Sequence, residues 1–186
     1  MVTFVLPTIN RESLKRTLFS IIKQSDPNWK CIVIFDGIPI NKIIDDKRLT
    51  YLSTEKKLGE IGTPHSKAGD VRNTVLPLVD TEVTAFVDDD DTLQTNYVSL
   101  INNDFDVDFV LYQMLLLGGR IVPGIGYRKI TENLTGISFA IRTDFIKKNN
   151  LKFQSCQTED YIFLKNAIDK GAKYRISDNV VYNVGF

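Results

Sequence analysis

The chain has 186 residues and a mass of 21.1 kDa, typical of one domain that buries enough apolar surface to fold without disulfides or a structural metal. Lys and Arg together number 23, as do Asp and Glu, so no excess of positive charge favours a nucleic-acid partner. The most apolar run, 112–118, falls far short of the ~18 residues of a transmembrane segment.

The first half of the chain alternates between buried strands and helices. Short continuous apolar runs, typical of strands buried on both faces, predict strands at 2–6, 31–35, 49–52 and 82–87. Apolar residues at helical spacing predict helices at 14–22, 71–79 and 93–101. Asn10 is the expected N-cap of the first helix. This alternation predicts an α/β sheet with parallel pairing.

The second half is less regular. It predicts an extended segment at 108–117, a glycine-rich loop at 118–130, a strand at 138–141, helices at 143–149 and 159–170, and a final strand at 180–184. No repeat, low-complexity segment or linker interrupts the sequence. We therefore predict one α/β domain over residues 1–186, with a mostly parallel central sheet flanked by helices.

The cysteines and the first residues bear on the compartment. Cys31 and Cys156 lie far apart, and one falls inside an apolar run, which favours two free thiols in a reducing compartment. The apolar segment 1–8 lacks a cationic leader and a small-residue cleavage site, so it predicts a first strand and not a signal peptide. We expect a cytoplasmic protein without a transmembrane segment, and peripheral contact with a membrane stays open.

Polar residues follow three of the predicted strands at the point where each ends. Pro7 and Thr8 follow the first strand, Asp36 the second, and the acidic run 88–91 the fourth. In open α/β sheets, ligands bind in the crevice beyond the carboxyl ends of parallel strands. These residues are therefore expected to face one crevice.

The acidic run Asp88-Asp89-Asp90-Asp91 is the strongest chemical signal in the sequence. Like charges crowded at a strand end repel each other and favour binding of a cation. Carboxylate oxygens suit Mg²⁺ or Mn²⁺, which take one or two carboxylates and leave other positions to water and phosphate oxygens. The alternative is a solvated acidic turn, but the run directly follows a strongly apolar strand, which favours the metal site.

The order of these motifs resembles that of family-2 glycosyltransferases with the GT-A fold. Arg72-Asn73, fourteen residues and then Asp88-x-Asp90-Asp91 resemble the arginine-asparagine and DxD pattern of that family. The opening 5–11 is similar to its first-strand signature, and segments 20–25 and 29–37 resemble its first helix and second strand. Glu159-Asp160 resembles the Glu-Asp motif near its catalytic centre. The resemblance spans nearly the whole chain and implies a single GT-A-like, Rossmann-like domain.

The resemblance implies a nucleotide pocket in the first half of this fold. Pro7, Thr8 and Asp36 would line it, with Asp36 accepting a hydrogen bond from the base. Arg72 would lie near the nucleotide or its phosphates. Phe35, Ile38, Val75 and Thr95 depart from the residues usual in the family, which affects the base and ribose contacts more than the metal site.

The resemblance also implies a metal and a base. Asp88 and Asp90 would form the DxD pair that holds Mn²⁺ or Mg²⁺, with Asp90 the main ligand and Asp88 or Asp89 close to the ribose. A divalent cation stabilises the negative charge of a diphosphate leaving group. Asp160 would be the general base that takes the proton of the acceptor hydroxyl. Attack opposite the leaving group would invert the anomeric centre.

The implied function is transfer of a sugar from a nucleotide-diphosphate sugar to an acceptor hydroxyl of a glycan or another molecule. A UDP-sugar is the favoured donor, and a GDP-sugar is the second option. Residues 1–103 would bind the nucleotide-sugar, and residues 104–186 would form the acceptor and catalytic half. The sole tryptophan is Trp29, so no Gln-x-x-Arg-Trp motif occurs and a processive polysaccharide synthase is not expected.

Each candidate residue has a purely structural alternative. Asp160 stands at a predicted helix start, where acidic residues are favoured by the helix dipole alone. Asp36-Gly37 is a common turn pair, and an arginine on a helix, such as Arg72, is usually solvated. His65, the only histidine, lies in a glycine-containing loop and is more often without function there than bound to phosphate or metal.

Two other functions compete with this interpretation. A nucleotidyltransferase or sugar pyrophosphorylase would be expected to carry a glycine-rich basic loop after the first strand, and segment 6–11 contains no glycine. A non-catalytic domain that binds a nucleotide or glycan would have no need of the Glu159-Asp160 pair, although the altered loop residues leave it open.

Overall fold

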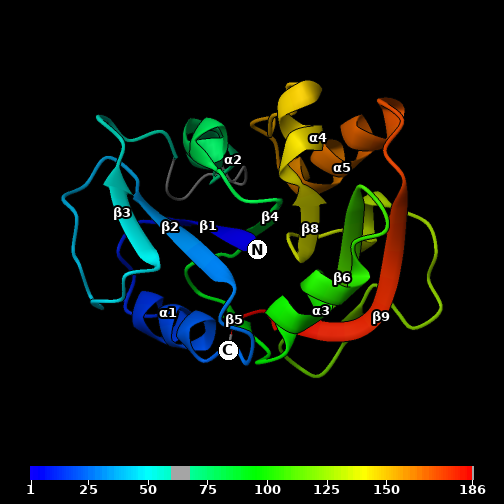
Figure 1. Ribbon diagram of the computed structural model, residues 1–186, viewed down its shortest axis with the longest axis horizontal. Helices are drawn as coiled ribbons and strands as arrows, with labels where there is room; N and C mark the ends of the chain where they lie inside the picture. The colour runs from blue at the N-terminus through cyan, green and yellow to red at the C-terminus, as the bar shows by residue number, and fades with distance from the viewer. Residues whose placement is uncertain (60–67, 186) are drawn as a thin grey trace.

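The computed structural model describes residues 1–59 and 68–185 of the chain (Figure 1). A mixed sheet runs through the centre, and helices cover both of its faces. His65, expected to be more often without function than bound to phosphate or metal, lies outside the described residues.

The sheet has the order β3-β2-β1-β4-β8-β6-β9-β5, with the short β7 paired to β6. Strands β3, β2, β1, β4, β6 and β9 run in one direction, and β8 is inserted antiparallel between β4 and β6. The predicted α/β class and mostly parallel sheet are therefore confirmed. The described strands are β1 (Val2–Thr8), β2 (Trp29–Phe35), β3 (Leu49–Ser53), β4 (Val83–Phe86), β5 (Thr92–Leu93), β6 (Phe109–Leu115), β7 (Ile121–Val122), β8 (Phe139–Arg142) and β9 (Tyr174–Asn183).

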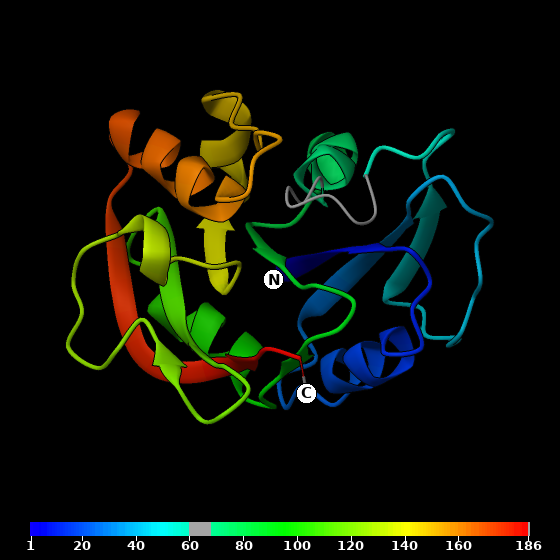
Figure 2. The ribbon, with the colours of Figure 1, turned by 180° about the vertical axis from the view of Figure 1, so that it is seen from behind.

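Two groups of helices sandwich the sheet (Figures 1 and 2). On one face lie α2 (Ala68–Val75), α4 (Thr143–Lys148) and α5 (Glu159–Asp169). On the other lie α1 (Leu14–Ile22) and α3 (Tyr97–Asp104). Two 3-10 turns, at Leu76–Leu78 and Glu132–Leu134, complete the helical segments described. Across residues 1–59 and 68–185, no helix has the length and apolar character needed to cross a membrane.

The central strands are buried on both faces because helices pack on each. Phe4 of β1 packs toward α3, with its ring centroid 5.9 Å from that of Tyr97. The next residue, Val5, pairs with Phe86 of β4, whose ring lies 6.0 Å from that of Phe163 in α5. Successive side chains of a strand point to opposite faces, so each face receives an apolar layer. This explains why the strands appear as continuous apolar runs rather than alternating patterns.

Three predicted boundaries differ from the observed ones by about four residues or more. The helix predicted over 71–79 ends at Val75, because Pro77 lacks an N–H and disfavours helical backbone in the residue before it. The helix predicted from position 93 begins at Tyr97, because residues Thr92–Leu93 pair with β9. The final strand begins at Tyr174, six residues before the predicted start, because it pairs with β6 along its whole length.

The connection from β1 to α1 also differs from the prediction. Asn10 is not the N-cap: the helix begins at Leu14, after Ser13. Asn10 instead has a φ of 63°, in the left-handed region that asparagine tolerates better than most residues. The predicted apolar face of α1 is confirmed, since Leu14, Leu18 and Ile21 are fully buried.

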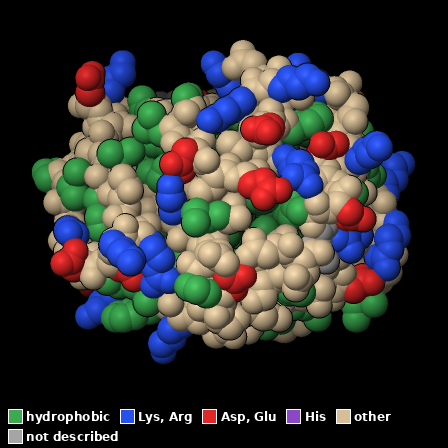
Figure 3. Space-filling model, in the orientation of Figure 1, with side chains coloured by type: hydrophobic (Ala, Val, Ile, Leu, Met, Phe, Trp, Pro, Cys, Tyr) green, Lys and Arg blue, Asp and Glu red, His purple; other side chains and the backbone are tan. Residues whose placement is uncertain are grey.

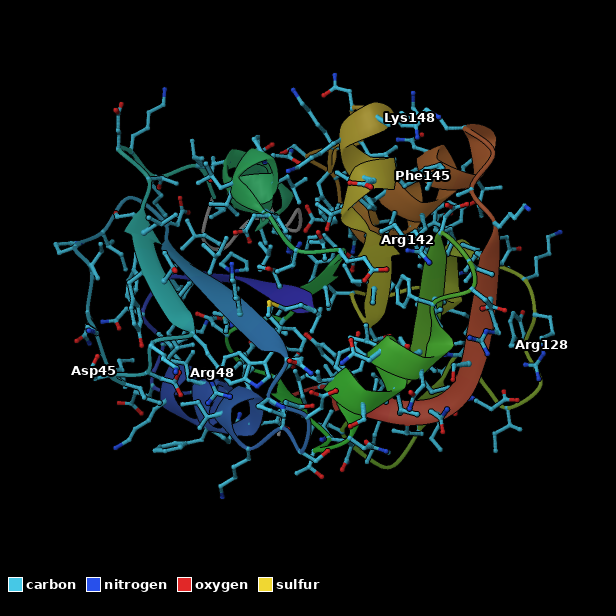
Figure 4. All side chains as sticks on the ribbon, in the orientation of Figure 1. Asp45, Arg48, Arg128, Arg142, Phe145 and Lys148 are labelled. Carbon is cyan, nitrogen blue, oxygen red and sulfur yellow. The ribbon has the colours of Figure 1, made fainter. Side chains whose placement is uncertain are left out.

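The amino end of β2 carries the single tryptophan. Trp29 is 1% exposed, and the guanidinium of Arg48, labelled in Figure 4 just before β3, lies 3.8 Å from its ring centroid. Cys31, two residues further along β2, is buried, and Cys156 is half-buried; both are free thiols, as predicted. On the face drawn in Figure 3, basic and acidic side chains are interspersed, in keeping with the zero net charge.

Candidate active site

The carboxyl ends of β2, β1 and β4 meet, as the sequence predicts. The backbone N–H of Asp36 donates to the carbonyl of Thr8 at 2.9 Å, which joins the ends of β2 and β1. The Thr8 hydroxyl donates to the Asp89 carboxylate at 2.6 Å, which joins β1 to the turn after β4. Pro7, inside β1, is buried beside them. The three predicted groups therefore lie together at the carboxyl end of these strands.

Each aspartate of the acidic turn, residues 88–91, has its own partner within the chain. On the buried side, the Asp88 carboxylate accepts a hydrogen bond from Arg72, and its backbone N–H donates to the Tyr182 hydroxyl at 2.9 Å. Asp91 is 4% exposed and accepts from the backbone N–H of Gly185 at 2.7 Å. Burial, followed by the charge of Asp88, raises the pKa of Asp91 to about 7.

Asp89 fastens the acidic turn to the loop after β1. Besides the Thr8 hydroxyl, its carboxylate accepts the backbone N–H of Ile9 at 3.3 Å, and its carbonyl accepts the Thr17 hydroxyl at 3.1 Å. The residue is 6% exposed, and burial raises the pKa of its carboxyl. Asp89 therefore has a structural role that its predicted place near the ribose does not require.

Asp90 has the most exposed side chain of the three aspartates 88–90. Its side chain is 44% exposed, against 37% for Asp88 and 8% for Asp89. Arg11 donates to its carboxylate, and Arg16 donates to its backbone carbonyl at 3.1 Å. Asp90, the predicted main metal ligand, is thus accessible but has a cation from the chain itself.

Arg72 lies at the centre of the buried side and is not on a solvated helix face. Its side chain is 2% exposed, and its two terminal nitrogens donate to different carboxylates: one to Asp88, the other to Glu159 at 2.6 Å. Burial opposes the positive charge, but Asp88, Asp160 and Glu159 together outweigh it and raise the pKa of Arg72. Arg72 therefore connects the acidic turn to the start of α5.

Glu159 holds this arrangement from the other side. Its second carboxylate oxygen accepts the backbone N–H of Gly69 at 3.0 Å. A Cβ at position 69 would stand 2.5 Å from both this oxygen and the Phe153 Cβ, so only glycine fits. Burial raises the pKa of Glu159, and Arg72 is the largest opposing influence. The carboxylate thus fixes α2 against α5 through two independent contacts.

Asp160, the predicted base, follows Glu159 in the first turn of α5. Its oxygen Oδ1 is buried and has no hydrogen-bond partner within residues 1–59 and 68–185. Burial raises the pKa of Asp160 to about 7, while the positive charge of Arg72 opposes the increase. Most buried polar atoms in proteins are paired, and a base is most effective when its pKa is near the working pH. The position and the pKa both suit a carboxylate that receives a proton.

Asp36 uses its carboxylate to shape the end of β2. The side chain is 3% exposed, and its two oxygens accept the backbone N–H groups of Leu58 at 2.6 Å and Gly59 at 2.8 Å. Gly37 has a φ of 64°, so the turn suggested by the Asp-Gly pair is present. Oδ1 of Asp36 also accepts the Thr54 hydroxyl at 3.4 Å, whereas Oδ2 has a second lone pair for a further donor. A contact between Asp36 and a nucleotide base stays a prediction.

Sequence reasoning gave no role to four residues that build the site: Arg11, Gly69, Glu159 and Tyr182. Arg11 and Glu159 lie inside the motifs noted above, but their partners are at least 78 positions away along the chain. Gly69 gave no signal beyond its effect as a helix breaker. Tyr182 lies on β9 and reaches the acidic turn only because that strand pairs with β6 and β5.

The carboxylates of Asp90 and Asp88 are suitable ligands for a hard divalent cation whose remaining coordination positions a bound ligand and water would fill. Among the described residues, no group of three or more His, Cys, Asp or Glu side chains converges on one point. Mg²⁺ is commonly held by one or two carboxylates together with substrate phosphates and water. Asp90 and Asp88, both partly exposed, are of the right chemistry for that arrangement and are too few to form a closed protein cage.

The chain is thus a three-layer α/β sandwich with an acidic turn at the carboxyl end of its central strands, the edge of such sheets where ligands commonly bind. The family model for glycosyl transferase family 2 matches residues 3–158. The chain belongs to this family.

Solved structures with the same fold include TarS of S. aureus. The TarS 1-349 fragment has a TM-score of 0.79 at 21% sequence identity and covers 98% of this chain. A longer TarS structure has a TM-score of 0.80 at 20% identity and covers the whole chain. TarS 1-349 in complex with UDP-GlcNAc has a TM-score of 0.80 at 21% identity, over 98% of this chain. These likenesses confirm the GT-A fold.

The chain is shorter than these proteins. It spans 60% of the length of TarS 1-349, 58% of the chain in the UDP-GlcNAc complex and 36% of the longer TarS chain. A search of curated protein sequences found no match.

Proposed function

We propose that the protein transfers a sugar from a UDP-sugar to an acceptor hydroxyl, with the help of Mn²⁺ or Mg²⁺. The observation that carries the proposal is the connection made by Arg72. Its guanidinium bonds to Asp88 of the acidic turn and to Glu159, the residue before Asp160. A site for a diphosphate and a candidate base therefore belong to one fixed unit, which a transferase needs and a simple binding domain does not.

The donor would bind across the carboxyl ends of β1, β2 and β4. Pro7, Thr8 and Asp36 would line the nucleotide pocket, and Asp88 with Asp89 would lie near the ribose. A GDP-sugar is the alternative donor. Support for uridine comes from TarS, which has been solved with UDP and with UDP-GlcNAc.

The metal would be held by Asp90, with Asp88 as second carboxylate. A bound divalent cation would neutralise charge on the diphosphate leaving group. Arg72 adds a fixed positive charge behind Asp88 and orients that carboxylate. The buried guanidinium does this without reorganisation during the reaction, because both of its terminal nitrogens are already engaged.

Asp160 would take the proton from the acceptor hydroxyl as that hydroxyl attacks the sugar. A carboxyl with a pKa of about 7 is ionised in part at neutral pH and is a much stronger base than an exposed aspartate. Attack opposite the leaving group needs one base on the acceptor side and inverts the anomeric carbon. Transfer of one sugar at a time fits a chain without the processive synthase motif.

The two halves of the chain would each supply part of the active site. Residues 1–103 supply the proposed nucleotide and metal ligands, and residues 104–186 supply Asp160 and the strand β9 that contacts the acidic turn. The acceptor would then bind on the side of α5, where the buried oxygen of Asp160 has no partner among the described residues.

Titration calorimetry with UDP, GDP, CDP and dTDP, each with and without Mn²⁺, tests the donor site. We expect UDP to bind most tightly, in a Mn²⁺-dependent way, and Asp90→Ala to lose most of the metal effect. Asp178→Ala is the matched control, since Asp178 is another partly exposed aspartate paired with an arginine. Binding that ignores both the metal and Asp90 would reduce the acidic run to a solvated turn.

Hydrolysis of UDP-sugars separates an enzyme from a binding domain. The wild-type protein is expected to hydrolyse one UDP-sugar slowly, because water can replace the acceptor, and Asp160→Asn should remove this rate. Tight UDP binding without hydrolysis or transfer from any donor would instead favour the non-catalytic alternative.

A further inference from the structure

Arg11 occupies the exposed side of the acidic turn. Its guanidinium nitrogen Nη1 donates to the Asp90 carboxylate and lies 3.5 Å from the Asp89 carboxylate. One cation of the chain therefore bridges two neighbouring aspartates. The same carboxylate of Asp90 is the proposed main ligand of the divalent metal.

The loop after β1 places Arg11 there by several independent contacts. The Thr8 hydroxyl and the Ile9 backbone N–H both donate to Asp89, which fixes the loop on the acidic turn. Asn10 then adopts a left-handed φ of 63°, and its backbone N–H donates back to the Thr8 hydroxyl at 2.9 Å. This reversal of the chain directs the next residue, Arg11, over the carboxylates that hold the loop.

The Arg11–Asp90 pair is exposed and is therefore easily exchanged. The side chains of Arg11 and Asp90 are 47% and 44% exposed. Solvent-exposed ion pairs contribute only about 0–1 kcal/mol, because water and salt screen them and the long side chain loses freedom. A divalent cation with phosphate oxygens to complete its coordination offers Asp90 a stronger partner than a screened guanidinium.

We infer that Arg11 and a divalent cation are alternative partners of Asp90: Arg11 holds the carboxylate in the free protein, and the cation displaces it when the nucleotide diphosphate binds. The inference rests on the proposed function, since it assigns the metal to Asp90. Arg11 neutralises the repulsion between Asp89 and Asp90 while the cation is absent. It also lowers the affinity for the metal alone, so that metal and nucleotide bind together.

Direct measurement of Mn²⁺ binding tests this inference without any activity assay. The free Mn²⁺ signal in electron paramagnetic resonance gives the Kd for wild type, Arg11→Gln and Asp90→Asn, each with and without UDP. We expect Arg11→Gln to bind Mn²⁺ alone about threefold more tightly than wild type, the gain from removing an exposed competing pair. Asp90→Asn should bind Mn²⁺ weakly in both conditions.

Two control variants keep the outcome clear. Arg128→Gln removes the arginine of another exposed pair, with Asp178, and should leave the Mn²⁺ affinity unchanged. Arg128 lies at the outer edge of the molecule, beside β9 (Figure 4). Arg11→Lys keeps the positive charge but replaces the planar fork with a point charge, so its affinity should fall between those of Arg11→Gln and wild type.

The results separate this inference from the proposed function. If Mn²⁺ binding needs Asp90 and is strengthened by UDP, but Arg11→Gln equals or falls below wild type, the competition is wrong and the metal site stands. If no form binds Mn²⁺ with or without UDP, both are wrong. Thermal melting with and without Mn²⁺ confirms that each variant is folded and gives a second, independent estimate of binding.

Discussion

Asp88 and Asp90, on opposite sides of the acidic turn, each pair with an arginine but in contrasting surroundings. At Asp88, the partner is Arg72, which is 2% exposed and also bonds to Glu159. At Asp90, the partner is Arg11, with both side chains close to half exposed. The Arg72–Glu159 pair is buried and cannot lose one member without leaving an uncompensated charge, whereas an exposed pair exchanges partners at little cost. The Asp88 side of the turn is therefore fixed by Arg72, and the Asp90 side is where a ligand can enter.

Replacing the buried arginine should give the largest effect. Arg72→Leu leaves Asp88 and Glu159 without their shared cation inside the protein, and we expect the free energy of unfolding to fall by about 3–5 kcal/mol. Urea denaturation measures this loss. A loss below about 1 kcal/mol would mean that water replaces Arg72 readily. The Asp88 side of the turn would then be no more fixed than the Asp90 side.

Removing the base should reduce activity by a comparable free energy without harming the fold. Asp160→Asn keeps the shape of the side chain but cannot accept a proton, so kcat should fall about 10³-fold. Steady-state transfer or donor hydrolysis measures the change. Asp169→Asn, at the other end of the same helix and exposed beside Lys165, is the matched control and should retain full activity.

The pH dependence of activity and of stability should both report the ionisation of Asp160, beside the fixed Arg72. Asp160 has a pKa of about 7 in the folded protein and must be ionised to act, so log kcat should rise with a slope near one up to about pH 7 and then level off. The folded state holds this proton more tightly than the unfolded chain does. The contribution of Asp160 to stability is thus present below about pH 4 and is lost as the pH rises through about 7.

The stability of Asp160→Asn checks the sign of that argument. The variant should be more stable than wild type at pH 8, where wild type buries a carboxylate, and equal to it near pH 4. A variant less stable than wild type at pH 8 would mean that the charge of Asp160 is satisfied in the folded state.

The smallest effect on stability is expected for Arg11, on the exposed Asp90 side of the turn. Arg11→Gln should change the free energy of unfolding by less than about 1 kcal/mol, since its ion pair is screened by water. The measurement is the same urea titration used for Arg72→Leu. A loss of about 3 kcal/mol or more would show that Arg11 is as structural as Arg72. The contrast between the Asp88 and Asp90 sides of the turn would then be wrong.

Much of the fold could be predicted because its elements have local causes. The strands are buried on both faces, so each appears as an apolar run, and the three polar strand ends meet because parallel strands end at one edge. The helix end at Val75 has a local cause in Pro77, but the other two boundaries that were wrong depend on pairing with distant segments. Thr92–Leu93 became a strand only because β9 lies beside it, and no local pattern reveals that partner.

The sequence indicated which residues form the candidate site, but not which of them contact one another. The acidic run 88–91 stood out in the sequence itself, whereas Asp160 was singled out only by the resemblance to family-2 glycosyltransferases. The burial of Arg72 could not, because an arginine on a short helix with modest amphipathicity is ordinarily solvated. Its burial follows from the approach of α5, which brings Glu159 within reach from 87 positions away.

The single tryptophan gives this protein a useful optical property. Trp29 is fully enclosed at the amino end of β2, with Arg48 against its ring, and Asp36 follows the opposite end of the same strand. A seven-residue strand is about 20 Å long, so the indole lies well away from the acidic turn. Tryptophan fluorescence therefore comes from one residue, and we expect it to respond to loss of the sheet far more than to the arrival of metal or nucleotide.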